Sequence, residues 1–531
     1  MTAAESALES RLAARRGGGS GLAALIALLL GLGLVYTGYQ LYHDLVSAPL
    51  QSALPYILLG VALLIALGFE FVNGFHDTAN AVATVIYTHS LQPNVAVVWS
   101  GIFNFLGVLT STGLVAFGII SLLPVELILQ VGSQAGFAMV FALLIAAIVW
   151  NLGTWYLGLP SSSSHTLIGS IIGVGLMNQL MAPVSSGTSG VDWEQAAGVG
   201  RALLFSPIVG FVGAALLLLL AKTLIRVPSL YRAPQGVAPP PWWIRGLLIL
   251  TCTGVSFAHG SNDGQKGMGL IMLILIGTVP TTYALNRSLP DSHLAQFSAA
   301  SAAAAQVVES KAAGYNVIGN PRPAVTLYVA QRKIGEGTYP SLAALVRDID
   351  QQVKEYGSFS KIPAGVIRNT RNDMYLVSEA IRFLAKDKEN ELSADEATKL
   401  STYKASLDSA TKFIPNWVKV AVAIALGLGT MIGWKRIVVT VGEKIGKEHL
   451  TYGQGAAAEL VAMGTIAAAD MYGLPVSTTH VLSSGVAGTM AANGSGLQWG
   501  TVKSLALAWV LTLPVSIVLS GCLFALFVHL F

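Results

Sequence analysis

Stretches of roughly twenty apolar residues recur along this chain of 531 residues, and they constrain its fold more than any other feature. A helix needs about 20 residues to cross the hydrocarbon core of a bilayer. The stretches consist of Leu, Ala, Val and Ile with glycine throughout, as packed membrane helices require. Only 11% of the residues are charged, against about 25% in soluble globular proteins. We therefore expect an all-α polytopic membrane protein, built of helices rather than as a barrel.

Residues 1–43 are predicted to form a cytoplasmic tail and an extra first helix. Three arginines within residues 11–16 precede an apolar stretch at 21–36, and no clear cleavage site follows. A signal peptide would have a shorter apolar region. Basic residues before the first span favour a start in the cytoplasm.

Two segments interrupt the hydrophobic pattern. Residues 226–243 contain basic residues and three consecutive prolines, which indicate a linker on the cytoplasmic face. Residues 287–412 hold 16 of the 31 Lys and Arg and 14 of the 27 Asp and Glu, which predicts a soluble insertion. Apolar residues there have helical spacing, so we expect a few amphipathic helices. The remaining segments are a first membrane repeat at 44–225, the start of a second repeat at 244–286 and its remainder at 413–531.

The course of the chain within the membrane is predicted in less detail. Residues 95–123 form one continuous apolar segment. Residues 161–176 are short for a full crossing, which favours a re-entrant arm with a partner at 476–490. The face that holds the insertion depends on whether residues 254–276 cross the membrane or turn back.

Comparing the chain with itself reveals a repeated acidic motif. Residues 68–81 align with residues 254–267, which superposes Asp77 on Asp263. A charge inside the membrane is costly and persists mainly where it faces a cavity or a partner. Glycines around both aspartates would let a helix unwind, so that freed carbonyls and the carboxylate could hold a small cation or a proton. The alternative places both aspartates at ordinary helix ends in the headgroup region. Two further charged candidates adjoin apolar segments: Glu70 and Lys266.

A second repeated motif is rich in hydroxyl groups. Residues 158–165, Gly-Leu-Pro-Ser-Ser-Ser-Ser-His, align with residues 473–480, Gly-Leu-Pro-Val-Ser-Thr-Thr-His. Proline suits the first turn of a helix, and the amides that follow favour an anion. Hydroxyls donate as well, so the paired runs suit a tetrahedral oxyanion, although simple helix capping is the alternative. The candidate binding residues are Ser161, Ser162, Ser163, Ser164, Ser477, Thr478 and Thr479.

A histidine follows each hydroxyl run directly, at His165 and His480. Histidine titrates near neutral pH, so the pair is a candidate proton relay. The alternative is a hydrogen-bonded structural role.

These repeated motifs resemble those of a known family. The segment Gly74-Phe-His-Asp-Thr-Ala-Asn-Ala81, its partner Gly260-Ser-Asn-Asp263 and the paired Pro-x-Ser-Ser/Thr-Ser/Thr-His runs are similar to the signatures of the Pit family of inorganic phosphate transporters. The similarity is closest to the bacterial low-affinity phosphate permeases. It spans both membrane halves and leaves out the first helix and the insertion.

The resemblance implies an inverted-repeat fold, a homodimer in the lipid of the bacterial inner membrane, and an insertion in the cytoplasm. It implies that phosphate is held between the hydroxyl runs and the aspartate segments, with Asn262 contributing, and is imported by cation symport. In the bacterial branch the cation is a proton, and phosphate travels as a neutral complex with magnesium or another divalent metal near Asp77 and Asp263. No cofactor, no metal site made by protein alone and no nucleic-acid partner is expected.

This sequence departs from the symmetrical pattern of the sodium-coupled members. His76 stands where the first copy would have Asn, and Lys266 stands where the second would have Asn. Loss of an amide ligand weakens a sodium site. Our hypothesis is that the Lys266 ammonium replaces a cation near Asp263 and leaves proton coupling to His76 and Asp77. The candidates for the coupling proton or cation are Asp77, Asp263, His76, Asn80, Lys266 and Glu70.

Several other functions are alternatives for the same motifs. A permease for sulfate or another oxyanion, and sodium-coupled phosphate symport, would use the same scaffold. An intramembrane hydrolase at Ser164 or Ser477 is disfavoured, because neighbouring Ser and His point in different directions on a helix and no Gly-x-Ser-x-Gly elbow is present. A phosphohydrolase built on His76 and Asp77 lacks further ligands, and a channel would not accumulate its substrate. We therefore expect a transporter and not an enzyme.

Overall fold

The computed structural model describes residues 19–46, 53–77, 79–129, 133–183, 190–234, 238–312, 317, 319–387 and 392–530. Within these ranges helices are the regular elements, apart from one isolated bridge between Gly446 and Leu497. Six of the described helices are long and apolar enough to cross a membrane, or seven if the bent pair α17 and α18 is one span. The expected all-α membrane architecture is confirmed.

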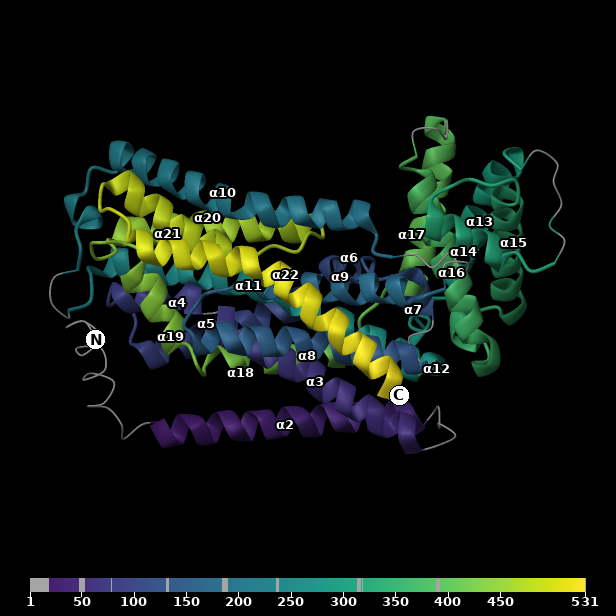
Figure 1. Ribbon diagram of the computed structural model, residues 1–531, viewed down its shortest axis with the longest axis horizontal. Coiled ribbons are helices and arrows are strands. Elements are labelled where there is room, and N and C mark those ends of the chain that lie inside the picture. The colour runs from purple at the N-terminus through teal and green to yellow at the C-terminus, as the bar shows by residue number, and fades with distance from the viewer. Residues whose placement is uncertain are drawn as a thin grey trace.

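The helices of the bundle follow one another in two sets (Figure 1). An extra helix, α2 (Gly19–Val46), precedes both sets and packs on α18. The first half comprises α3 (Ala53–Asp77), α4 (Ala79–Tyr87), α5 (Pro93–Thr110), α6 (Leu114–Ile120), α7 (Val125–Leu129), α8 (Gln134–Tyr156), α9 (Ser163–Met181) and α10 (Trp193–Leu224). After the 3-10 turn η3 (Pro228–Tyr231), the second half comprises α11 (Trp242–Thr278), α12 (Pro280–Tyr283), α18 (Asn416–Thr430), α19 (Lys435–Val439), the π-turn η5 (Thr440–Lys444), α20 (Tyr452–Met471), α21 (Thr478–Asn493) and α22 (Trp499–Leu530).

The two halves pack by exchanging equivalent helices. Helix α3 packs on α18 as α11 packs on α5, and α9 packs on α22 as α21 packs on α10. Within each half, α8 contacts α9 as α20 contacts α21. This mirrored pairing agrees with the repeated motifs, while the inverted orientation of the repeats across the membrane stays a prediction.

Two superposed glycines of the acidic motif lie at close approaches between these helices. A Cβ atom on Gly74 would lie 2.3 Å from the carbonyl oxygen of Leu426, and one on Gly260 would lie 2.1 Å from that of Asn104. Any larger residue would push the helices apart. The glycines are therefore explained by backbone contact between the halves.

Around Asp263 the structure differs from our expectation of an unwound helix. Helix α11 continues through Asp263 without a break for 37 residues, about 55 Å at 1.5 Å per residue. In the first half, α3 does end at Asp77. The glycines near Asp263 serve close packing and not unwinding, because Gly260, Gly264 and Gly267 all face neighbouring side chains or backbone.

The apolar segment at 95–123 is also interrupted, contrary to prediction. Helix α5 ends at Thr110 and α6 begins at Leu114, with Gly113 between them at a φ of 89°. Only glycine adopts this left-handed conformation without strain. Hydropathy alone does not register such a turn, since every residue beside it is still apolar or small.

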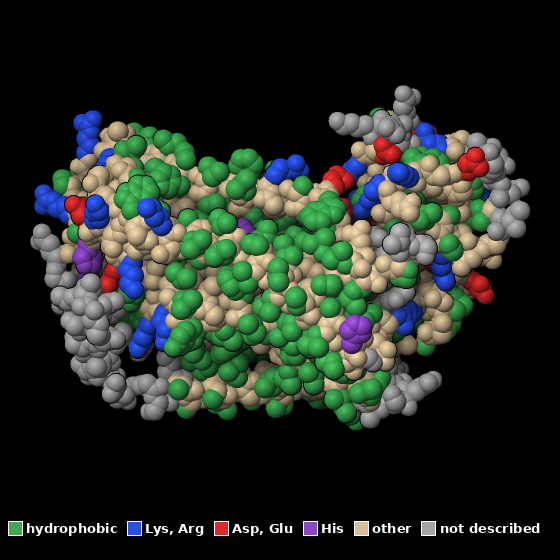
Figure 2. Space-filling model, viewed as in Figure 1, with side chains coloured by type: hydrophobic (Ala, Val, Ile, Leu, Met, Phe, Trp, Pro, Cys, Tyr) green, Lys and Arg blue, Asp and Glu red, His purple; other side chains and the backbone are tan. Residues whose placement is uncertain are grey.

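The unbroken course of α11 also bears on the placement of the insertion. The linker joins the first residue of α11 and the insertion follows its last, so the two lie at opposite ends of the bundle (Figure 1). If α11 crosses the membrane along its whole length, the linker and the insertion lie on opposite faces. In the view of Figure 2, apolar side chains cover the flank between the two ends, and Lys and Arg lie at both ends, together with Asp and Glu in the insertion. The cytoplasmic location of the insertion therefore stays a prediction.

The insertion forms a helical group of its own beside the bundle (Figure 1). Its helices are α13 (Ser292–Ser310), α14 (Arg322–Gln331), α15 (Thr338–Tyr356), α16 (Ala364–Leu384) and α17 (Ala394–Thr411), with the 3-10 turn η4 (Phe359–Lys361). The apolar residues with helical spacing are buried, including Leu342, Leu345 and Val346 of α15 and Val377 and Ile381 of α16. The predicted amphipathic helices are confirmed.

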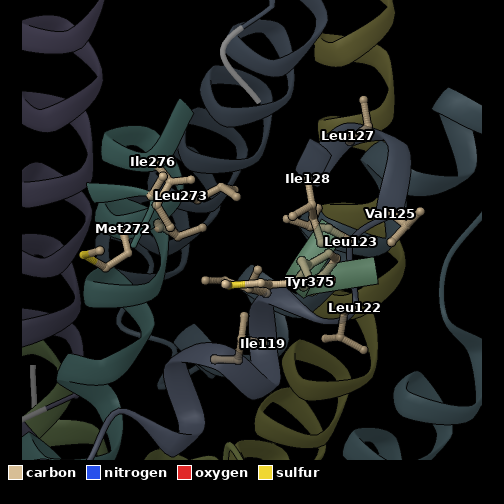
Figure 3. Close-up of a cluster of buried hydrophobic side chains, with 14 of the residues drawn as sticks. Ile119, Leu122, Leu123, Val125, Leu127, Ile128, Met272, Leu273, Ile276 and Tyr375 are labelled. Atoms are coloured by element: carbon tan, nitrogen blue, oxygen red, sulfur yellow. The ribbon is translucent and has the colours of Figure 1, made fainter. Parts of the chain in front are cut away.

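One buried hydrophobic cluster joins the insertion to the bundle. Tyr375 of α16 belongs to the same cluster as Ile119, Leu123 and Ile128 from the region of α6 and α7 and as Met272 of α11 (Figure 3). An ion pair adds to this contact, since an Arg382 guanidinium nitrogen lies 2.8 Å from the carboxylate of Asp192 at the start of α10. The insertion is therefore packed on the bundle and is not a loose tether.

Candidate phosphate site

Helices α9 and α21 both begin inside the bundle, directly after the hydroxyl-rich motifs. The Ser162 hydroxyl caps α9 by accepting the His165 amide at 3.2 Å, and the Ser477 hydroxyl caps α21 by accepting the His480 amide at 3.1 Å. Ser162 and Ser477 therefore act as helix caps, which is the alternative that we considered for the hydroxyl motifs. Capping leaves other first-turn amides of each helix directed toward the space beyond its start, where an anion is favoured.

The carboxylate of Asp77 is the point where the two hydroxyl motifs meet. Ser163 of α9 donates its hydroxyl to Oδ2 at 2.6 Å, and Thr479 of α21 donates to Oδ1 at 2.7 Å. The His76 Nδ1 lies 2.9 Å from Oδ1. Asp77 is 3% exposed. The two halves thus contribute one hydroxyl each to a single buried carboxylate at the end of α3.

His76 connects this carboxylate to a second pair of hydroxyls. Its Nε2 lies 3.2 Å from the Thr154 hydroxyl and 3.3 Å from the Ser161 hydroxyl, which are 2.8 Å apart. The ring is therefore held at both nitrogens. The ring thus links the Asp77 carboxylate to the Thr154 and Ser161 hydroxyls.

The second aspartate has a different environment, made by its own helix. Lys266 Nζ lies 2.7 Å from Asp263 Oδ2, and His259 Nε2 lies 3.3 Å from the same oxygen. Their spacing of three and four residues places all three side chains on one face of α11. Lys266 is fully buried, and a buried ammonium requires a close counter-charge such as this one.

Ser163 also bridges the two aspartates. Its hydroxyl oxygen lies 3.3 Å from Asp263 Oδ2 and accepts a hydrogen bond from Lys266 Nζ at 3.2 Å. The two motifs that repeat in sequence are thereby joined in one buried polar cluster between the halves. Asp77, His259 and Asp263 each bring a ligand atom within 4.8 Å of one another, which is close enough to hold a metal ion.

Other predicted binding residues hold backbone groups instead. The Ser164 hydroxyl donates to the carbonyl of Val476 at 2.7 Å, and Asn262 Nδ2 donates to that of Leu474 at 3.1 Å. These contacts fix the segment that precedes α21. The Thr478 hydroxyl is buried and has no hydrogen-bond partner among the described residues.

Two predicted coupling residues lie at the edge of this cluster. Glu70 is fully buried on α3, where Asn73 Nδ2 lies 3.4 Å from its Oε2. Its side chain packs on Gly267, where a Cβ atom would lie 2.5 Å from Oε1. The side chain of Asn80 falls outside the described residues.

The two histidines that follow the hydroxyl runs face each other between the halves. The rings of His165 and His480 have centroids 4.5 Å apart, and Trp509 of α22 stacks on His480 at 4.2 Å. His165 Nδ1 and His480 Nε2 have no hydrogen-bond partner among the described residues. This is contact between rings and not the hydrogen-bonded structural role that we considered.

Sequence reasoning missed His259 and Thr154. His259 stands at the position of Asn73 in the aligned acidic motifs, one helical turn before Asp263. The spacing from His259 to Asp263 was a usable signal, although the two copies of the motif do not share this histidine. Thr154 lies on α8 and had no signal, because only the tertiary structure brings it to His76.

Comparisons with known proteins identify the relatives of this chain. The family model described as "Phosphate transporter family" matches residues 73–520. The low-affinity inorganic phosphate transporter PitA of Escherichia coli K12 is 43% identical over 490 residues, covering 88% of this chain and 96% of that protein. PitB of the same strain is 40% identical over 485 residues with the same coverage, and a low-affinity inorganic phosphate transporter of Buchnera aphidicola from Acyrthosiphon pisum is 40% identical over 488 residues.

The solved structure of a sodium-dependent phosphate transporter is more distant, at a TM-score of 0.47 and 17% identity, covering 88% of this chain and 98% of its own. The resemblance seen in the motifs is confirmed by the sequence comparisons, and with it the expectation of a transporter rather than an enzyme. The family match covers both hydroxyl motifs and both aspartates of the buried cluster. This multi-pass membrane protein belongs to the phosphate transporter family.

Proposed function

We propose that the protein imports inorganic phosphate across the bacterial inner membrane by proton symport, as a homodimer. The observation that carries the proposal is the convergence of Ser163 and Thr479, from helix starts in opposite halves, on the Asp77 carboxylate. A phosphate oxyanion can accept the same two hydroxyls together with first-turn amides of α9 and α21. Phosphate binding would then compete with Asp77 for its donors.

Competition for donors supports a coupling mechanism. When the Ser163 and Thr479 hydroxyls turn to phosphate, the Asp77 carboxylate loses two hydrogen bonds in a buried site. A buried carboxylate without partners favours the neutral, protonated form. Proton uptake at Asp77, with His76 as its neighbour, would therefore accompany phosphate binding.

Lys266 supports proton rather than sodium coupling. Its ammonium lies 2.7 Å from Asp263 and 3.2 Å from Ser163. A cation at this point would meet a fixed positive charge in a buried environment, where repulsion is strong. The ammonium itself would also attract the phosphate, which Asp77 and Asp263 otherwise repel.

A divalent metal ion is a further candidate cargo, because it would enter together with phosphate, whose negative charge offsets the repulsion by Lys266. Asp77, His259 and Asp263 offer two carboxylate oxygens and one imidazole nitrogen within 4.8 Å. Oxygen ligands suit magnesium, which commonly binds one or two carboxylates together with phosphate oxygens. A metal-phosphate complex would also reduce the charge carried through the bilayer.

The central test is uptake of radiolabelled phosphate by purified protein in liposomes, with the pH gradient, sodium and magnesium varied independently. We expect accumulation that follows an inward proton gradient and continues without sodium. Sodium-dependent uptake that ignores the pH gradient would contradict proton coupling. Arsenate, which mimics phosphate in charge and protonation, should compete, and stronger competition by sulfate would favour the alternative of a general oxyanion permease.

A further inference from the structure

A buried carboxylate lies outside the cluster described above. Glu459 of α20 is fully buried, and each of its carboxylate oxygens accepts a hydroxyl, Oε1 from Thr84 of α4 and Oε2 from Thr251 of α11. The ion pairs of the described residues do not include it. A charge inside a membrane protein is expected to have a partner or a function. Glu459 has two neutral donors and no described basic partner.

Glu459 touches the same two helical segments that carry the aspartates. Thr84 lies on α4, which follows Asp77 in the chain, and Thr251 lies more than three turns before Asp263 on α11, about 18 Å along the helix. Thr251 is on the side of Asp263 that leads back to the basic linker. Glu459 therefore lies between the aspartate cluster and the end of the bundle that we assign to the cytoplasm.

The other half of the molecule does not repeat this residue. Aligning Gly158 with Gly473 superposes α8 on α20, and Glu459 then corresponds to Leu144. Leu144 is fully buried within the hydrophobic core. An apolar side chain thus serves packing at this position of the scaffold, and the carboxyl group of Glu459 needs another explanation.

The surroundings of Glu459 favour a proton over a metal ion. Calcium takes six to eight oxygen ligands and magnesium demands an octahedral set, whereas Glu459 has two hydroxyls. A proton needs only the carboxylate itself and a hydroxyl that can turn from donor to acceptor.

The groups that face Glu459 from the elements packed on α20 do not supply a counter-charge. The Cys252 thiol on α11 is the titratable group that interacts with it electrostatically. Titratable groups on three of the other elements have partners elsewhere: Lys222 of α10 with Asn493, Tyr231 of η3 with the Ile225 carbonyl, and His480 of α21 with Trp509.

We propose that Glu459 is a second proton-binding group of the transport cycle, on the cytoplasmic side of the phosphate site. Its carboxylate takes up one proton to form the neutral acid and releases it toward the basic face as the helices that carry Thr84 and Thr251 move. This inference rests on the proposed proton symport. It adds a site remote from phosphate, so the chemistry of the two sites can be tested separately.

The test is Glu459→Gln, which keeps a polar group that can contact both hydroxyls but cannot exchange a proton. Exchange of phosphate between the two sides of the liposome needs no net proton movement and should stay within about twofold of the unmodified protein. Net uptake driven by a pH gradient should fall by at least about 10-fold. Glu448→Gln, the same change at an exposed glutamate, is the matched control and should alter neither rate.

Infrared spectroscopy of the reconstituted protein gives an independent measurement. The carbonyl stretch of a protonated carboxyl group should appear and disappear with pH and should be missing from Glu459→Gln. Thr251→Val removes one hydroxyl contact and keeps the carboxyl, so the band should remain at a shifted frequency. This variant also serves if Glu459→Gln fails to fold.

The outcomes separate this inference from the proposed function. If the unmodified protein shows proton-driven uptake and Glu459→Gln matches it in rate and pH dependence, the inference is wrong and the proposed function stands. If the unmodified protein shows no proton-driven uptake, both are overturned, even where a titrating band is present. Retained net uptake together with an unchanged infrared band in Glu459→Gln would also rule out a proton at this residue.

Discussion

Asp77 and Asp263 occupy matching positions in the two halves, yet different partners stabilise them. Asp77 accepts neutral hydroxyls from Ser163 and Thr479, whereas Asp263 faces the ammonium of Lys266 at 2.7 Å. A hydroxyl can turn to another acceptor, but a buried lysine needs its counter-charge throughout. The comparison teaches that the repeat supplies a common scaffold, and that the exchangeable carboxylate belongs to the first half.

A second pair of matching positions shows the same contrast. Phe75 packs edge-on against Trp155 with ring centroids 5.2 Å apart. The aligned residues in the second half are Ser261 and Asp470, and the Ser261 hydroxyl donates to the Asp470 carboxylate at 2.6 Å. An apolar contact joins α3 and α8 in the first half, whereas a hydrogen bond joins α11 and α20 in the second half.

The contrast between the two aspartates is tested most directly by a substitution at Asp77. We expect Asp77→Asn to lower phosphate uptake at least about 100-fold, because the amide loses the charge that both hydroxyls and the transported proton require. The measurement is initial uptake in liposomes, with size-exclusion behaviour as the control for folding. If Asp77→Asn and Asp263→Asn both left transport intact, the assignment of the site would fail.

Removing the partner of Asp263 should act on stability first. Lys266→Met leaves an unpaired buried carboxylate, and breaking a buried pair in this way costs about 3–5 kcal/mol. Thermal unfolding in detergent measures the loss, and the double variant Asp263→Asn with Lys266→Met should recover most of it. No recovery in the double variant would mean that the two side chains act separately.

The same position tests the choice of coupling ion. Lys266→Asn restores the residue of the symmetrical pattern and removes the fixed positive charge beside Asp263. We expect phosphate uptake by this variant to be stimulated by sodium, since repulsion of a second cation is removed. Uptake that remains indifferent to sodium would separate Lys266 from ion selection.

Removing the two hydroxyls that donate to Asp77 should lower phosphate uptake by different amounts. Ser163→Ala removes contacts with both aspartates and Lys266, whereas Thr479→Val removes the contact with Asp77. A hydrogen bond to a charged group contributes about 1.5–3 kcal/mol, so Thr479→Val should lower uptake about 10-fold and Ser163→Ala further. Equal losses would contradict the bridging role of Ser163. Ser360→Ala, in the insertion, is the control.

The smallest effect is expected at the contact between the insertion and the first half, where Arg382 pairs with Asp192. Burial would raise the pKa of Asp192, but the hydrogen bond and charge of Arg382 outweigh it and hold that pKa below its usual 3.8. A lowered pKa stabilises the folded state above the unfolded value, and this contribution is lost as the pH falls through the folded pKa. Asp192→Asn should destabilise the insertion by about 1 kcal/mol, a modest value because asparagine keeps an oxygen that can accept the hydrogen bond and loses only the charge.

Proteolysis of the insertion measures this change, with phosphate uptake at neutral pH expected to stay the same. The difference in cleavage rate between Asp192→Asn and the unmodified protein should shrink below pH 4. A difference that persists at low pH would show that the charge of Asp192 does not hold the contact.

Properties that depend on neighbouring residues were predictable from the sequence. Apolar runs and helical spacing indicate membrane and insertion helices, and self-comparison finds Asp77, Asp263 and both hydroxyl motifs. The caps at Ser162 and Ser477 also follow from local rules, because each joins residues three apart. These features are short-range, so composition and spacing record them.

The tertiary structure alone decided which of these groups meet. Ser163 and Thr479 are far apart in the chain, and their convergence on one carboxylate depends on how α9 and α21 cross between the halves. The turn at Gly113 and the unbroken α11 depend on packing in the same way. Thr154 at His76, and Thr84 and Thr251 at Glu459, gave no signal in sequence, because hydrogen bonds across a bundle leave no periodicity along the chain.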